Sequence, residues 1–229
     1  MSTLTIYVGH DSREQLAYDV CVHSIKKRTN AEVVKLSTEL IPDYKRPKEK
    51  DQSTDFTYSR FFVPHLNNYK GYAMFVDCDF VFLDDPVKML EYVEPWKAVN
   101  VCKHPQYTPN SVLKMDGVQQ HAMLYKNWAS LMIFNCDHPT TRKLTPEYIN
   151  SVQPGRRLHQ FDWVQDNFLI GSIPLDWNCL DEYYHIASPK AIHYTDGGPW
   201  FKNYEHTFYS RYWYAEYTDM LLNDTSRSV

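Results

Sequence analysis

Apolar and polar positions near the start of the chain follow three successive patterns. Residues 5–8 (TIYV) are a short apolar run of strand-forming residues, and Gly9 ends it. From Leu16 to Ile25 the apolar residues recur with helical spacing, and three basic residues close the pattern, as suits a helix C-terminus. Residues 32–36 again indicate a strand. A strand–helix–strand opening favours a parallel sheet in an α/β domain.

The helix start carries a capping signal, because Asp11 is a common N-cap residue and Glu14 follows it at the spacing of a capping box. The chain then continues to alternate. We expect further strands over residues 73–76, 80–83, 97–102 and 130–134, and helices over 55–66, 145–152, 161–170 and within the aromatic segment 204–217. Asp85-Pro86 predicts another short helix, with proline at its first position. No repeat or boundary interrupts the pattern, so we expect one domain over residues 1–229.

Two segments read as loops. Residues 42–51 (PDYKRPKEKD) are charged and broken by proline, which indicates either a solvated connection or a mobile lid. Residues 103–125 are expected to form a loop with a short helix.

Composition and charge exclude several classes of protein. The 229 residues carry a net charge of −4 with a pI near 6.2, which argues against a nucleic-acid binder. No apolar stretch approaches the roughly 20 residues that span a bilayer. The first residues lack the basic and apolar parts of a signal peptide. The five cysteines form no CxxC pair, so we expect a reduced, cytoplasmic protein.

The most informative segment is 75–82 (FVDCDFVF). Residues i and i+2 of an extended chain project to one face, so Asp77 and Asp79 point together while Cys78 turns back into the core. Two carboxylates at the end of a buried strand are costly unless a cation or hydrogen bonds compensate them. The pair therefore indicates either a divalent metal bridged to phosphate oxygens or a strand-end turn.

Six segments resemble, in order, nucleotide-sugar-dependent glycosyltransferases of the GT-A fold, especially glycosyltransferase family 8 and its small bacterial and phage-type relatives. They are VGHDSREQLAYDVCVHSI (8–25), TDFTYSRFFVP (54–64), FVDCD (75–79), NWASLMIFNC (127–136), FDWVQDN (161–167) and HYTDGGPW (193–200). The resemblance implies a GT-A domain with a mixed, mainly parallel sheet flanked by helices. It also implies transfer of a hexose, glucose or galactose, from a UDP-sugar with retention of configuration. The acceptor, whether saccharide, lipid-linked or protein, and the oligomeric state stay open.

The resemblance also implies where the donor binds. The first strand-to-helix turn would receive uracil, with backbone at Gly9 close by and Asp11 accepting the base N3–H unless it serves only as an N-cap. Arg13 is either a phosphate or base contact or a surface cation. Arg60 lies near the donor unless it forms a structural ion pair, and its fork suits phosphate or sugar hydroxyls. The other donor-site residues that the resemblance implies are Cys78, Asn127 and Ser130.

His193 follows the strand-like residues 191–192, and the resemblance makes it the third metal ligand beside Asp77 and Asp79. Mixed oxygen and nitrogen ligands suit Mn²⁺ better than Mg²⁺. The family commonly has lysine before Pro-Trp where this chain has Gly198. Backbone N–H groups of Gly197 and Gly198, or else Lys202 or Arg13, would then contact the diphosphate.

Asp162, Gln165 and Asp166 have the spacing of one helix face. The resemblance brings this region to the anomeric centre as the catalytic group, whereas a plain reading is a polar helix face. Two rival functions stay open. An inverting transferase would use Asp162 or Asp166 as its base, and a UDP-sugar binding protein would perform no transfer.

Overall fold

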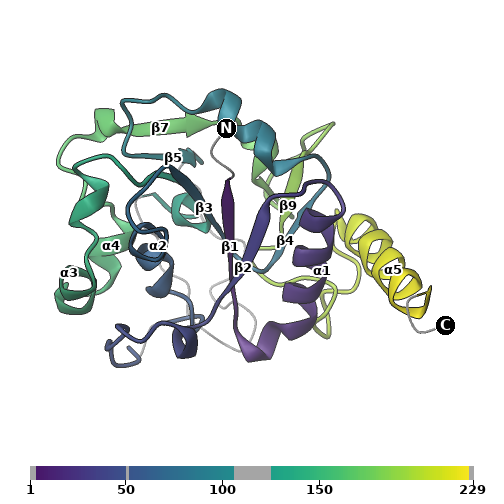
Figure 1. Cartoon of the computed structure of the whole chain (residues 1–229). Helices are drawn as coiled ribbons and strands as arrows, with labels where there is room; N and C mark the ends of the chain where they lie inside the picture. Colours follow the sequence, from purple (N-terminus) through teal and green to yellow (C-terminus); the bar gives the residue numbers. More distant parts are fainter. Residues whose placement is uncertain (1–3, 50–51, 106–124, 227–229) are drawn as a thin grey trace.

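The fold is built on a central mixed sheet, shown in Figure 1 in a computed structural model that describes residues 4–49, 52–105 and 125–226. The six strands lie in the order β2 (Glu32–Leu36), β1 (Thr5–Gly9), β3 (Tyr72–Val76), β6 (Leu131–Asn135), β5 (Val99–Cys102) and β7 (Ile170–Ile173). β6 runs antiparallel to β3 and β5, and the other neighbouring pairs are parallel. The predicted α/β fold with a mixed, mainly parallel sheet is confirmed.

A second, three-stranded sheet joins distant parts of the chain. Its order is β4 (Phe80–Phe82), β9 (Ala191–His193) and β8 (Cys179–Leu180). β9 is antiparallel to β4, with His193 opposite Phe80, and parallel to β8, with His193 opposite Leu180. Since β4 follows β3 after only residues 77–79, this pairing carries His193 to the end of β3.

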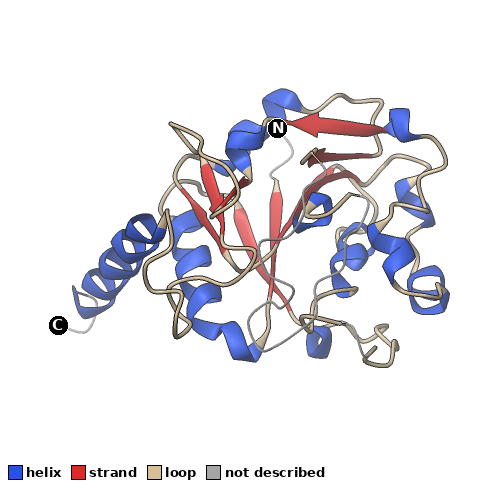
Figure 2. Ribbon diagram, turned by 180° about the vertical axis from the view of Figure 1, so that it is seen from behind, coloured by secondary structure: helices blue, strands red, loops and turns tan. Residues whose placement is uncertain are grey.

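Helices cover both sides of the central sheet, as the view from behind shows (Figure 2). The α-helices are α1 (Gln15–Lys26), α2 (Val63–Leu66), α3 (Pro146–Ser151), α4 (Arg156–His159) and α5 (Ser210–Ser226). In the part of the chain that the structure describes, the 3₁₀ helices are η1 (Ser12–Glu14), η2 (Thr38–Leu40), η3 (Ser59–Phe62), η4 (Pro86–Tyr92), η6 (Trp128–Ser130), η7 (Thr141–Lys143), η8 (Asn167–Leu169) and η9 (Leu175–Trp177).

The last helix, α5, lies beside α1 at the edge of the molecule (Figure 1). Ion pairs join the two helices: Arg28 lies 2.6 Å from Glu216, and Lys27 lies 2.9 Å from Asp219. Glu216 is buried, so its charge depends on Arg28 and on Lys27, whose Nζ also lies 3.5 Å from Glu216 Oε2. The predicted aromatic helix is present, but it begins at Ser210 instead of near Tyr204.

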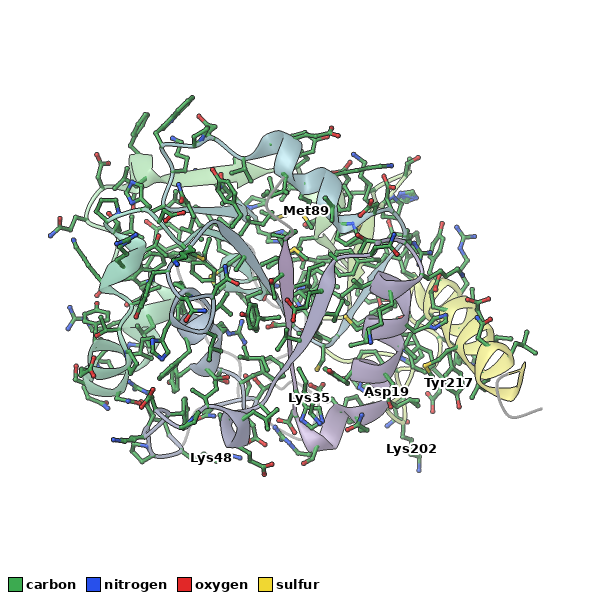
Figure 3. All side chains as sticks on the ribbon, in the orientation of Figure 1. Asp19, Lys35, Lys48, Met89, Lys202 and Tyr217 are labelled. Atoms are coloured by element: carbon green, nitrogen blue, oxygen red, sulfur yellow. The ribbon has the colours of Figure 1, made fainter. Side chains whose placement is uncertain are left out.

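The core lies between the sheet and its helices. All residues of β4 and the last four of β3 are buried, as their continuous apolar run predicts. Met89 of η4 is also fully buried among the side chains that cover the sheet (Figure 3). Among the described residues, no helix has the length and apolar content needed to cross a membrane. The five cysteines are unpaired and buried.

Two local predictions are wrong, and the helix predicted over 55–66 forms only from Ser59 onward, as η3 followed by α2. Residues 161–170 are not a helix: α4 ends before Phe161, whose φ of 57° lies in the left-handed region, and turns follow up to η8. Glu14 does not complete a capping box. The Asp11 side chain accepts from the backbone N–H of Arg13, while Glu14 turns into the core. Of the predicted loop 103–125, residues 106–124 lie outside the described part of the chain, as do residues 50 and 51 of the segment 42–51.

Candidate metal centre and donor site

The two aspartates lie in the three-residue link between β3 and β4. Backbone hydrogen bonds hold this link at both ends. Asp77 N donates to Ser130 O at 2.9 Å, and Tyr194 N donates to Asp79 O at 2.9 Å. The extended link places Cys78 in the core, where it is 1% exposed, as predicted. These hydrogen bonds therefore fix the backbone positions from which the Asp77 and Asp79 side chains extend.

Asp77, Asp79 and His193 form a group of potential metal ligands. One ligand atom from each residue lies within 4.8 Å of the other two. His193 Nε2 lies 3.3 Å from Asp79 Oδ2, and both aspartate side chains keep partial access to solvent. Two carboxylates and one imidazole, open on one side, fit a divalent cation that keeps free positions for another ligand.

The His193 ring is held by two neighbours. Its Nδ1 lies 3.0 Å from Asn178 Oδ1, and its plane stacks on Phe80 with ring centroids 4.3 Å apart. Asn178 is fully buried and carries no motif in the sequence, so sequence reasoning missed it. His104 is buried nearby, and burial, followed by the effect of His193, lowers its pKa to about 3. It therefore stays neutral and adds no charge.

Arg60 is the buried cation beside the aspartates. Its Nη1 lies 3.0 Å from Asp77 Oδ1 and donates to Ala129 O at 2.7 Å. The guanidinium carbon lies 4.7 Å from the ring centroid of Phe75. Burial lowers the pKa of Arg60, while Asp77 and Asp79 favour its charged form. The structure thus provides the ion pair, and a contact between Arg60 and the donor stays a prediction.

Glu14 is a buried acid beneath the same link. Cys78 Sγ donates to Glu14 Oε2 at 3.4 Å, and the second carboxyl oxygen has no hydrogen-bond partner. Burial, followed by repulsion from Asp79, raises the pKa of Glu14 to about 8. The carboxyl is therefore mostly protonated at neutral pH. The spacing from Asp11 predicted a capping residue and did not indicate that Glu14 would be a buried, mostly neutral acid.

The predicted uracil-binding turn is strongly hydrogen-bonded. The buried Asp11 carboxylate accepts from the backbone N–H groups of Arg13 and Asp55 and from the Arg13 guanidinium, at 2.6–3.0 Å. Burial alone would raise the pKa of Asp11, but these bonds hold it below its usual value. Gly9 leaves room for Phe56, whose ring lies 2.6 Å from where a Cβ would be. Base contacts by this turn stay predictions.

The other predicted donor residues divide into two places. Ser130 and Asn127 are linked to His193 through Asn178: Asn178 Nδ2 donates to Ser130 Oγ at 2.9 Å, and Ser130 Oγ donates to Asn127 O. Gly197 has a φ of 126°, and a Cβ on Gly198 would lie 2.1 Å from Trp200. Glycine is therefore required at both positions whether or not their N–H groups meet a diphosphate. Lys202 is exposed and extends outward (Figure 3).

The proposed catalytic residues lie on exposed turns instead of one helix face. Asp162 pairs with Arg157 at 2.8 Å, and Asp166 accepts from Phe168 N as the N-cap of η8. Gln165 is exposed beside them. Asp162 also lines an open pocket of about 320 Å³ together with Tyr125, Gln160, Phe161, Val164 and Asn167. Their catalytic role stays a prediction.

Comparisons with known proteins point to one fold. No protein-family model matches the chain. Protein CDI of Arabidopsis thaliana is 41% identical over 231 residues, which cover 96% of this chain and 85% of that protein.

Several similar solved structures are glycosyltransferases. WbbM, a bifunctional one, has a TM-score of 0.67 at 16% identity over 94% of this chain and 50% of its own. GlyE of Streptococcus pneumoniae TIGR4 has a TM-score of 0.61 at 12% identity over 100% and 65%. The galactosyltransferase LgtC, solved with donor and acceptor sugar analogues, has a TM-score of 0.58 at 12% identity over 94% and 95%. The chain thus spans half of WbbM and less than two thirds of GlyE. At these identities the likeness shows the fold, which is GT-A.

Proposed function

The chain belongs to the same family as Protein CDI of Arabidopsis thaliana and has the GT-A fold, and from this premise we propose that it is a metal-dependent glycosyltransferase. The observation that carries the proposal is the group formed by Asp77, Asp79 and His193 at the end of β3. These residues would hold Mn²⁺, or Mg²⁺. When bound, the metal would neutralise the negative charge of a leaving diphosphate.

The charges around the group support a metal-dependent site. Asp77 and Asp79 carry two negative charges, Arg60 carries one positive charge, and Glu14 is mostly neutral. The remaining net charge of −1 would repel a diphosphate. A divalent cation reverses that sign, so binding of an anionic donor should require the metal.

We propose that the donor is a UDP-sugar with glucose or galactose as its hexose, and that the configuration is retained. The support is the six-segment resemblance to family 8 enzymes, together with the turn at Gly9 and Asp11. The Asp11 carboxylate already accepts four hydrogen bonds, so accepting the uracil N3–H requires one of them to open. The acceptor is a saccharide, a lipid-linked sugar or a protein.

Donor hydrolysis tests this function without knowledge of the acceptor. UDP release is measured from UDP-glucose and UDP-galactose with Mn²⁺, with Mg²⁺ and with chelator. We expect metal-dependent release that Asp79→Asn abolishes and that Asp43→Asn, at a carboxylate 54% exposed, leaves unchanged. Equal stabilisation by UDP and GDP in thermal unfolding would contradict the UDP assignment. Donor binding without turnover would indicate the non-enzymatic alternative, and NMR of the released sugar reports its anomeric configuration.

A further inference from the structure

A chain of three hydrogen bonds, two of them buried, leads from the backbone to His193. Ser130 Oγ donates to Asn127 O at 2.7 Å, Asn178 Nδ2 donates to Ser130 Oγ at 2.9 Å, and Asn178 Oδ1 lies 3.0 Å from His193 Nδ1. Ser130, Asn178 and His193 are each at most 3% exposed. Water therefore offers these three side chains few alternative partners.

The direction of every bond follows from the first group. A backbone carbonyl only accepts, so the Ser130 hydroxyl proton points to Asn127 O. Ser130 Oγ must then accept from Asn178, which turns the amide NH₂ toward serine and the amide oxygen toward His193. An oxygen at this distance requires a proton on His193 Nδ1. The lone pair of the neutral ring is then on Nε2, 3.3 Å from Asp79 Oδ2.

The opposite arrangement is less favourable. If His193 carried its proton on Nε2, Asn178 would have to flip and face Ser130 Oγ with an oxygen. Either the Ser130 hydroxyl would then give up its 2.7 Å hydrogen bond to Asn127 O in order to donate to Asn178, or two buried acceptors would meet without a proton between them. The Asp79 side chain is 12% exposed, so it is less dependent on that proton than the fully buried Asn178 amide is on its partners. The buried chain therefore decides the tautomer.

We propose that Asn178 is a positioning residue that holds His193 as its Nδ1–H tautomer, so that Nε2 is presented as a metal ligand. This rests on the metal site of the proposed function. The fold supplies Asn178 through the strand pairing, because it directly precedes β8, which lies parallel to β9. Phe80 fixes only the plane of the ring, since stacking does not distinguish the two nitrogens. Ser130 acts through Asn178, and its predicted contact with the donor stays a prediction.

The first measurement is the tautomer in the metal-free protein. Long-range ¹H–¹⁵N NMR of ¹⁵N-histidine-labelled protein is recorded at about pH 8.5, above the ordinary histidine pKa, and His193→Gln assigns the signal. The wild type should show Nδ1–H. Asn178→Asp should keep it, because a carboxylate also accepts from Nδ1, whereas Asn178→Leu should lose it. Asn135→Leu is the matched control: it removes an asparagine bond to Pro95 O and should leave the signal unchanged.

The second measurement is calorimetric titration with Mn²⁺. Asn178→Leu should weaken binding by roughly 10–100-fold, as loss of such orienting partners does, and Asn178→Asp should restore it. A lower melting temperature with unchanged tautomer and Mn²⁺ affinity in Asn178→Leu would overturn the proposal. So would an Nε2–H signal in the wild type. If the protein shows the Nδ1–H signal but does not hydrolyse the donor, the proposed function is contradicted, whereas the role of Asn178 is not.

Discussion

Replacing Arg60 with methionine should destabilise the metal-free protein strongly. The substitution keeps most of the apolar stem but leaves the Asp77 carboxylate, 14% exposed, without the guanidinium 3.0 Å away. Breaking a buried ion pair by removing one partner costs about 3–5 kcal/mol. For a chain of this length, such a loss lowers the melting temperature by roughly 6–20 °C. The Ala129 carbonyl also loses its donor.

A double-mutant cycle separates the charge effect from lost packing. Asp77→Asn alone should also destabilise the protein, because it leaves the buried Arg60 guanidinium without its nearest carboxylate. Arg60→Met with Asp77→Asn should recover part of the lost stability, since both charges of the 3.0 Å pair are then removed together. The control is Arg142→Met, whose partner Asp137 lies 3.5 Å away at the surface, and which should cost about 1 kcal/mol or less.

Chemical denaturation without metal measures all four variants. If the losses from Arg60→Met and Asp77→Asn simply add, the two side chains act independently and the reasoning is wrong. An Arg60→Met loss no larger than that of Arg142→Met would refute it as well.

Three further outcomes test other parts of the molecule. Burial raises the pKa of Asp181 from 3.8 to about 6, so its stability contribution is present below pH 3.8 and lost as the pH rises through 6. Asp181→Asn should therefore equal the wild type in acid but exceed it above pH 6 by up to about 3 kcal/mol in denaturant unfolding; a pH-independent difference contradicts this. Gly171→Ala places a Cβ 1.9 Å from Asn100 Oδ1 and should cost about 1–3 kcal/mol in thermal unfolding, an unchanged melting temperature being the contrary result. Glu216→Gln weakens the ion pair with Arg28, so it should speed hydrogen exchange in α5 but not in the central sheet. Equal exchange rates in the variant and the wild type would show that this ion pair does not hold α5 against α1.

The pattern of apolar residues predicted the strands well. Each strand is a short run of buried apolar residues, and such a run can be recognised from adjacent positions alone. The same pattern placed residues 161–170 in a helix. Phe161, Trp163 and Val164 are indeed buried, but they reach the core from successive turns after the left-handed Phe161. Spacing alone cannot distinguish these two ways of burying an apolar side chain.

The sequence by itself determined the alternation at 75–82, which sends Asp77 and Asp79 one way and Cys78 the other. The family resemblance then implied His193 as a third ligand. Only the tertiary structure decided what surrounds them. Pairing of β4 with β9 brings His193 across 116 positions of the chain, and pairing of β8 with β9 adds Asn178. Burial beside the aspartates raises the pKa of Glu14 and lowers the pKa of Arg60. The spacing of residues along a strand determines to which face each side chain points. The partners of that side chain and its degree of burial depend on contacts between segments that are far apart in the sequence.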